Sequence, residues 1–190
     1  MVALYHKVQR VETLQEMAEK ETKAFKKRAG IDCLCHCSDC CRYEQIEATP
    51  LEFMPLAWHA YKLDLLEDWL EALEKHDSPA CFFARFENGR WGCKIYHLRG
   101  MICRLFGFSG LTDKNGKVKF AVCHSLKEKS PNMVEKAKEY VEKGGKMPLL
   151  CNFYRRLTAI DFVLANQYLP INQAIKKALE MVYFHFCYKR

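Results

Sequence analysis

The sequence contains no long hydrophobic run, no internal repeat and no low-complexity segment. No apolar stretch approaches the roughly 20 residues that a transmembrane helix needs, so we expect no membrane span. The first residues, 1–7, lack the apolar core of a secretion signal and are soon followed by many charged side chains. Because these absences favour a cytoplasmic protein, we expect its thiols to be kept reduced.

Cysteine, by contrast, is plentiful, with 11 residues among 190. Five of them, together with His36, lie in the short segment 33–41. Thiols at this density either bind metal or form disulfides. A reducing compartment and an odd number of cysteines both favour metal binding. Cys151 and Cys187 are exceptions, because both lie in apolar helical patterns and are expected to be small core residues.

The other thiols form two groups along the chain. Short spacings such as Cys-x2-Cys allow two sulfurs from one turn to hold one ion, and hairpin ends supply similar pairs. Soft thiolate ligands select zinc, Cu(I) or iron–sulfur clusters over magnesium or calcium. The expected ligands are Cys33, Cys37, Cys40 and Cys41 in the first group, and Cys81, Cys93, Cys103 and Cys123 in the second.

The adjacent pair Cys40-Cys41 indicates more than one metal atom. Neighbouring side chains point apart in an extended chain, so the two thiols more readily serve two metal centres, or two irons of one cluster, than a single ion. Eight thiolates suffice for two tetrahedral Zn²⁺ ions or two [4Fe–4S] clusters. The pair favours an iron–sulfur cluster, and Zn²⁺ is the alternative. Three further residues are possible metal ligands. Cys35 could bind in place of Cys33, and the imidazoles of His36 and His124 could bind as well.

Arginine and tyrosine side chains are expected beside the ligands. Guanidinium groups near an anionic thiolate site donate hydrogen bonds to it and offset its charge. We therefore place Tyr96, Arg99 and Arg104 around the metal rather than on it.

The formal net charge of +7 raises the question of nucleic-acid binding. Eight thiolates holding two Zn²⁺ ions would lower this charge to about +3. The basic runs at residues 26–28 and 155–156 are short, and they lie on predicted helices with acidic neighbours. A nucleic-acid partner is therefore not expected.

The pattern of apolar residues predicts an α+β protein. A helix is expected over residues 8–28, with the cysteine cluster in the loop that follows. Thr49 and Glu52 are typical of a capping box at a helix start. That helix should continue to about residue 75, with an interruption near Pro55.

Two Asn-Gly pairs predict β-hairpins in the middle of the chain. Asn88-Gly89 and Asn115-Gly116 each lie between apolar segments that alternate as strands do. We expect a small antiparallel sheet over about residues 81–123, organised around the metal site and packed with several helices. The expected strands cover residues 81–86, 90–96, 106–108 and 118–123.

The rest of the chain is expected to be mainly helical, with helices over about 131–143, 148–167 and 171–188. This pattern divides the chain into an N-terminal helix (1–30), a cysteine-cluster metal-binding core (31–128) and a helical C-terminal extension (129–190). We expect the three parts to pack as one globular unit. An unknown protein partner is expected to bind through the C-terminal helices.

The second cysteine group carries a motif that resembles a known family. Residues 92–104 read Gly-Cys-Lys-Ile-Tyr-His-Leu-Arg-Gly-Met-Ile-Cys-Arg. This is similar to Gly-x-Cys-x-Ile-Tyr-x-x-Arg-Pro-x-x-Cys-Arg of the YkgJ-type cysteine-cluster (CxxCxxCC) family, which is described as zinc- or iron-chelating. The resemblance covers residues 33–123. The chain departs from the family pattern in the x3 spacing after Cys33, in Gly100 where proline is usual, and in Ala80 before Cys81.

Carried over by position, the resemblance implies that six of these cysteines bind metal. Cys33 and Cys123 rank after these six as implied ligands. The six are Cys37, Cys40, Cys41, Cys81, Cys93 and Cys103. The family implies no defined cellular role. A similar cluster in flagellin lysine methylases suggests modification chemistry in some members.

Three classes of function follow from these observations. We favour a non-catalytic metalloprotein over an iron–sulfur redox or protein-modifying enzyme or accessory, and both over a zinc-dependent nucleic-acid-binding module. No Gly-x-Gly-x-Gly loop follows a strand, as an S-adenosylmethionine site would require. Cys33-x3-Cys37-x2-Cys40 formally matches the triad of radical enzymes, but the alternating strand–helix pattern of their barrel is missing. Whether the protein is an enzyme stays open.

Overall fold

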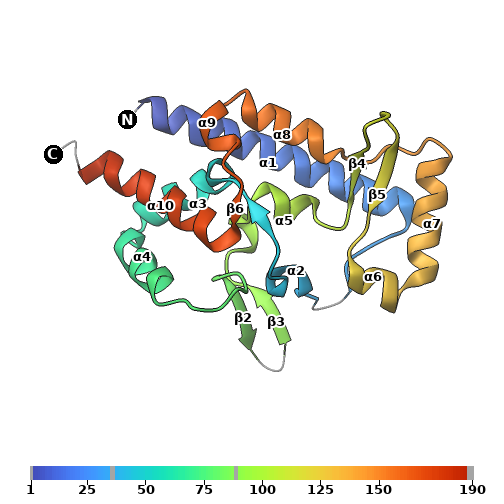
Figure 1. Ribbon diagram of the computed structural model, residues 1–190, viewed down its shortest axis with the longest axis horizontal. Coiled ribbons are helices and arrows are strands. Elements are labelled where there is room, and N and C mark those ends of the chain that lie inside the picture. The colour runs from blue at the N-terminus through green and yellow to red at the C-terminus, as the bar shows by residue number, and fades with distance from the viewer. Residues whose placement is uncertain (1, 35–36, 88–89, 188–190) are drawn as a thin grey trace.

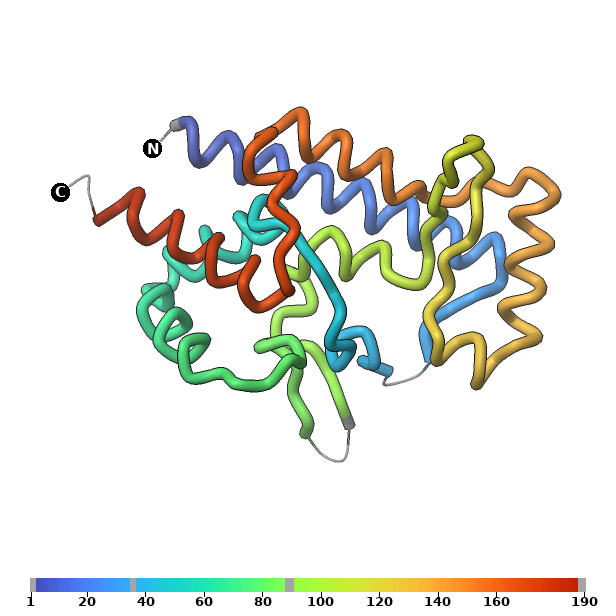
Figure 2. The backbone as a smooth tube through the Cα atoms, in the orientation of Figure 1, coloured from blue at the N-terminus to red at the C-terminus, as the bar shows by residue number. Residues whose placement is uncertain are grey.

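The computed structural model describes residues 2–34, 37–87 and 90–187. It is mostly helical with short two-stranded antiparallel sheets, so the predicted α+β class is confirmed. No helix among these residues is both long and apolar enough to cross a bilayer. In Figure 2, α1 (Val2–Ala29) begins on the same side of the molecule on which α10 (Ile171–Cys187) ends.

The long helix α1 runs along much of the length of the molecule, between α8 (Leu150–Thr158) and α5 (Met101–Leu105) (Figure 1). Its apolar side chains recur at helical spacing and are buried, as at Val8, Val11 and Leu14. This confirms the helix predicted over residues 8–28. In Figure 1, α8 and α9 (Phe162–Ala165) run beside α1. Lys7 of α1 joins this layer through an ion pair of 2.5 Å to Asp161, the N-cap of α9.

A second group of helices packs beside α1. Helix α10 contacts α3 (Met54–Lys62) and α4 (Leu66–Glu74). It approaches them through a buried face that includes Ala174, Ala178 and Val182. The predicted helix over residues 171–188 is therefore present and positioned by its small and branched side chains.

The helix expected over residues 49–75 consists of three elements, the 3-10 helix η1 (Pro50–Phe53), α3 and α4. The predicted capping box is present, with the Thr49 backbone N–H donating to Glu52 Oε1 at 2.8 Å. The interruption predicted near Pro55 is confirmed, because η1 ends at Phe53 and α3 begins at Met54, with Pro55 in the first turn of α3, where its missing N–H costs little. A second break, which was not predicted, lies at Asp64, which has a φ of 57°.

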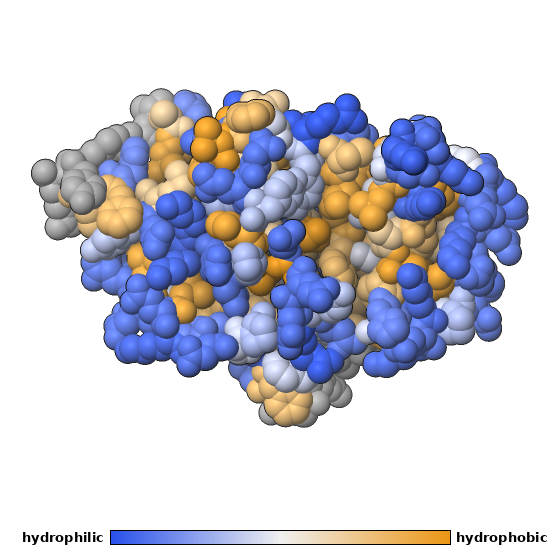
Figure 3. Space-filling view, in the orientation of Figure 1, coloured by the Kyte–Doolittle hydropathy of each residue, from blue (hydrophilic) through white to orange (hydrophobic). Residues whose placement is uncertain are grey.

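Both predicted hairpins are present. Strand β2 (Ala84–Glu87) pairs with β3 (Arg90–Cys93), and β4 (Ser109–Thr112) pairs with β5 (Val118–Ala121). Asn88 and Gly89 themselves lie outside the described residues. The two hairpins do not pair with each other in the described part of the chain, so the antiparallel region expected over residues 81–123 consists of two separate two-stranded sheets. Figure 3 shows apolar atoms on the protruding β2–β3 hairpin, where Phe86 and Trp91 are exposed.

The second hairpin starts later than predicted. Phe106 ends α5 (Met101–Leu105) instead of opening a strand, and Gly107, with a φ of 77°, turns the chain before Ser109. A third strand pair, β1 (Glu47–Ala48) with β6 (Leu169–Pro170), joins residues too distant for sequence patterns to connect. The remaining elements are α2 (Asp39–Arg42), the 3-10 helix η2 (Tyr96–Leu98), α6 (His124–Lys129) and α7 (Pro131–Glu142).

Two buried apolar clusters form the core. The larger combines α1, η1, α3, α8 and α10, and the smaller joins the end of α1 to β5, α6 and α7. Both clusters draw side chains from all three predicted parts of the chain, whose boundaries stay a prediction. The expectation that Cys187 is a core residue is wrong, because its side chain is exposed, and Cys151 is only half-buried.

The fully buried Glu52 joins four elements. Its Oε1 accepts hydrogen bonds from the Thr49 N–H and, at 3.1 Å, from the Tyr154 hydroxyl of α8. Its Oε2 accepts the Ile102 N–H of α5 at 2.7 Å, and Gln15 of α1 donates to its main-chain carbonyl at 2.7 Å. Burial raises the pKa of Glu52, and these donors oppose that rise. The carboxylate therefore acts as a cross-link between helices.

Gly100 packs directly against this network. A Cβ at this position would lie 2.8 Å from both Glu52 Oε2 and Phe53 Cζ. Gly100→Ala should therefore lower the free energy of unfolding by about 1–3 kcal/mol through overpacking, as measured by urea denaturation. Gly92→Ala is the matched control, since its Cβ would meet the Arg85 side chain at an ordinary 3.5 Å. Equal losses of stability in the two variants would contradict this packing.

Candidate metal centre

All eight cysteines predicted as ligands line one cavity of about 680 Å³. They come from the loop after α1, from α2, from the turn before β2, from the end of β3, from α5 and from the residue before α6. Cys81 is buried and Cys33 is exposed, and the other six are half-buried. All the described cysteines are free thiols. The fold thus gathers into one place side chains that are spread from residue 33 to residue 123.

An inner group of thiols surrounds α2 and consists of Cys40, Cys41, Cys81, Cys93 and Cys103. The Cys81 N–H donates to the Cys41 carbonyl at 2.8 Å, which fixes the turn before β2 onto α2. Cys93 is the last residue of β3, and Cys103 lies in the α5 helix that Glu52 holds. Hairpin, short helix and buried carboxylate therefore act together to place these thiols.

An outer group consists of Cys33, Cys37 and Cys123, with Cys40 adjoining both groups. The Cys37 N–H donates to the Leu34 carbonyl at 3.0 Å, which ties Cys37 to the residue that follows Cys33. Gly107 lies against Cys123, where an added Cβ would be 3.3 Å from the cysteine Cβ. The pKa of Cys33 is raised to about 12 by partial desolvation, and then by Cys37 and Cys40.

The inner thiols perturb one another strongly. A hydrogen bond from the Cys41 thiol lowers the pKa of Cys93 to about 6 against the effect of burial, with help from Arg99. The pKa of Cys41 rises because its thiol bonds to Cys40 and Cys93. Burial raises the pKa of Cys81 to about 11. Without added positive charge only part of this set ionises, so eight thiolates together require a bound cation.

Burial also raises the pKa of Cys103 well above its ordinary value, with Cys81 adding to the effect. Cys40 differs, because a hydrogen bond with Cys41 and the charge of Arg99 lower its pKa. A thiolate at Cys40 therefore has local support, whereas one at Cys103 needs a metal ion beside it.

The three residues predicted to flank the ligands all line this cavity. Arg99 Nη2 and Arg104 Nη1 lie 2.7 and 3.1 Å from Glu19 Oε2 of α1. The Arg99 guanidinium also lies 4.0 Å from the Tyr96 ring centroid, and Arg104 donates to the His97 carbonyl at 2.6 Å. Glu19 was not predicted, since a helix residue 80 positions from Arg99 gives no local signal.

Two buried side-chain polar atoms lack a hydrogen-bond partner in the described part of the chain, and both belong to residues that line this cavity. They are Ser38 Oγ and Arg99 Nε. A hydroxyl and a guanidinium N–H can both donate to an anionic, acceptor-rich group such as metal-bound sulfur. The donors and the thiols together therefore fit a metal–thiolate centre.

The remaining candidate ligands are less favourably placed. His124 lines the cavity, but its imidazole is exposed and lies 3.1 Å from Glu128 Oε1. Cys35 and His36 lie outside the described residues. Over 2–34, 37–87 and 90–187, no three or more His, Cys, Asp or Glu side chains stand as they would around a bound ion.

A family comparison agrees with this arrangement. Residues 32–152, more than half of the chain, match the CxxCxxCC family, whose description reads "Putative zinc- or iron-chelating domain". The chain therefore belongs to this family. The match extends beyond the motif region into α6, α7 and the start of α8. No curated protein and no solved structure matches the chain. Family membership supports a zinc or iron cofactor without distinguishing the two.

The pKa differences predict an order of thiol reactivity in the metal-free protein. Alkylation of Cys93 by iodoacetamide should reach half its maximal rate near pH 6, because its pKa is lowered to about 6 and the thiolate is the nucleophile. Cys81 should stay unmodified at neutral pH, because burial raises its pKa to about 11. Peptide mass spectrometry measures both rates. Modification of Cys81 before Cys93 would contradict the predicted order of the two pKa values.

Proposed function

We propose that this chain is a cysteine-ligated metalloprotein in which eight thiols hold two neighbouring metal centres. The observation that carries the proposal is the single cavity lined by all eight thiols. Family membership supports metal chelation in general. The two centres and their individual ligands are our inference from the geometry.

The eight thiols form two sets of four if Cys40 and Cys41 bind different metal centres. Cys41 lies with the inner thiols Cys81, Cys93 and Cys103, whereas Cys40 can turn toward the outer thiols. The outer set is then Cys33, Cys37, Cys40 and Cys123. Each set supplies the four thiolates that a tetrahedral zinc ion or a [4Fe–4S] cluster requires.

The cavity favours iron–sulfur clusters over bare zinc ions. A water molecule takes up about 30 Å³ of the liquid, so a cavity of about 680 Å³ far exceeds the space of two ions. The unpartnered donors Ser38 Oγ and Arg99 Nε would also be satisfied by the sulfides of a cluster. Zinc stays the alternative, because the thiol set fits it equally well.

The surrounding residues would balance the charge of such a centre. Arg99 and Arg104 lie beside the thiols, and Glu19 holds both guanidinium groups in place. A bound iron–sulfur cluster would supply one-electron chemistry, and zinc would supply a structural cross-link. The exposed Phe162 and Val163 of α9 support a protein partner at the C-terminal helices.

A redox role, as an enzyme or as an accessory to one, is the second candidate. The exposure of Cys33 favours it, because an outer centre at this position could exchange electrons with a partner at the surface. Dithionite should then bleach the visible absorbance reversibly under anaerobic conditions. Absorbance that dithionite does not change would support the structural role instead.

Single cysteine substitutions test the proposed division. Cys93→Ser should remove the inner centre and Cys37→Ser the outer one, so each variant should retain about half of the wild-type metal. Cys40→Ser should lose the outer metal as Cys37→Ser does. Metal content is measured by elemental analysis of anaerobically purified protein.

Cys151→Ser is the matched control, because Cys151 is half-buried but does not line the cavity. It should keep the full metal content. Full metal content in the Cys37, Cys40 and Cys93 variants would refute the assigned ligands.

A further inference from the structure

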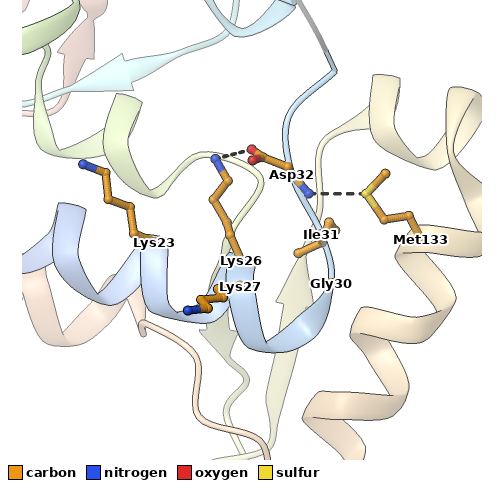
Figure 4. Close-up of a pocket in the computed structure, with 7 residues that line it drawn as sticks. All are labelled: Lys23, Lys26, Lys27, Gly30, Ile31, Asp32 and Met133. Atoms are coloured by element: carbon orange, nitrogen blue, oxygen red, sulfur yellow. Dashed lines mark hydrogen bonds and ion pairs between the residues drawn. The ribbon is translucent and has the colours of Figure 1, made fainter.

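A second hollow of about 560 Å³ adjoins the cysteine cavity. Lys23 and Lys26 line both spaces. Figure 4 shows this hollow at the C-terminal end of α1, with Met133 of α7 facing Asp32. Asp32 immediately precedes Cys33, the exposed thiol of the outer group. The hollow therefore borders the point at which the chain leaves α1 and enters the metal centre.

Asp32 is fixed on both sides at this point. Its Oδ1 forms an ion pair with Lys26 Nζ and accepts the Cys33 N–H at 2.6 Å. Its own N–H donates to Met133 Sδ at 3.3 Å (Figure 4). The preceding Ile31 is buried, and its N–H donates to the Lys26 carbonyl at 3.1 Å. Side chain and main chain together hold Cys33 in one place.

The inner thiols have a different kind of support. Cys81 is itself buried, and Cys103 follows the Ile102 N–H that Glu52 holds. Cys33 is exposed, so burial supplies less of its restraint. Its position depends on the contacts of Asp32.

We propose that Asp32 is a positioning residue for the outer metal centre. By holding Cys33 toward the cavity it slows the loss of outer metal, and the outer centre is the half that releases its metal first. The proposal rests on the proposed metal function. It also assigns the leading ligand of the first group to Cys33, because Asp32 holds the backbone of this residue.

Metal loss to a chelator tests the proposal. The anaerobically purified protein, with the metal it carries, is mixed with excess EDTA, and the metal that remains is measured over time after desalting. The wild type should lose its metal in two phases of similar size. Asp32→Ala should speed the first phase about fivefold and leave the second unchanged, the scale expected for losing a partly exposed ion pair beside a ligand.

Asp113→Ala is the matched control. Asp113 also accepts backbone N–H groups, from Asn115 and Lys117, but it lies in the β4–β5 turn and does not line the cavity. It should change neither phase. Asp32→Asn removes the ion pair alone, and Lys26→Met removes it together with the contact of Lys26 Nζ with the Phe108 ring, whose centroid lies 4.8 Å away. Both should speed the first phase by a smaller factor, with the fold checked by circular dichroism.

The outcomes separate this inference from the proposed function. Two phases that all three Asp32 and Lys26 variants leave unchanged would overturn the role of Asp32 and leave the metal centres standing. Equal acceleration of both phases would overturn it as well, because general loosening of the fold is not positioning. A wild-type protein that carries no metal after anaerobic purification would overturn the proposed function itself.

Discussion

The buried carboxylate of Glu52 is the contact on which the inner wall of the thiol cavity depends. Its partners lie on α8 and at the start of α5, next to Cys103, and Gln15 of α1 donates to the main-chain carbonyl of the same residue. A carboxylate without solvent is stable only when its oxygens are hydrogen-bonded, so these elements must come together in one arrangement. The helices and the cysteine-bearing segments are therefore not independent. Packing of the helices decides where the inner thiols lie.

The cavity itself is a concentration of groups that resist ionising together. Burial and neighbouring thiols raise the pKa of Cys103, whereas the hydrogen bond from Cys41, a backbone hydrogen bond from Ile95 and the charge of Arg99 lower the pKa of Cys93. A metal ion or an iron–sulfur cluster would remove this conflict, because every thiolate then has a positive partner. Arg99 and Arg104, held by Glu19, supply the remaining positive charge. The clustered thiols that resist ionising together in the metal-free protein would thus stabilise the cavity once they bind a metal as thiolates.

Much of this arrangement could be predicted from the sequence, because it depends on local patterns. The capping box at Thr49 and the two hairpins follow from short spacings whose physics is local. Contacts between distant residues could not be predicted. No short sequence pattern encodes the packing behind three of these contacts. They are the ion pair of Glu19 with Arg99, the β1–β6 strand pair and the ion pair of Lys26 with Asp32. The break after α3 was also missed, because Asp64 enters the left-handed region without a glycine to signal it.

The most direct test of the central claim is anaerobic purification followed by a visible spectrum, with analysis of iron, zinc and acid-labile sulfide on the same sample. The account predicts a coloured protein that contains iron and sulfide in similar amounts and loses both when the thiols are alkylated after unfolding. A colourless protein with about two equivalents of zinc would keep the metal centres but contradict the iron–sulfur assignment. A protein with neither metal would contradict the account as a whole, because the account assigns the eight thiols of the cavity to metal binding.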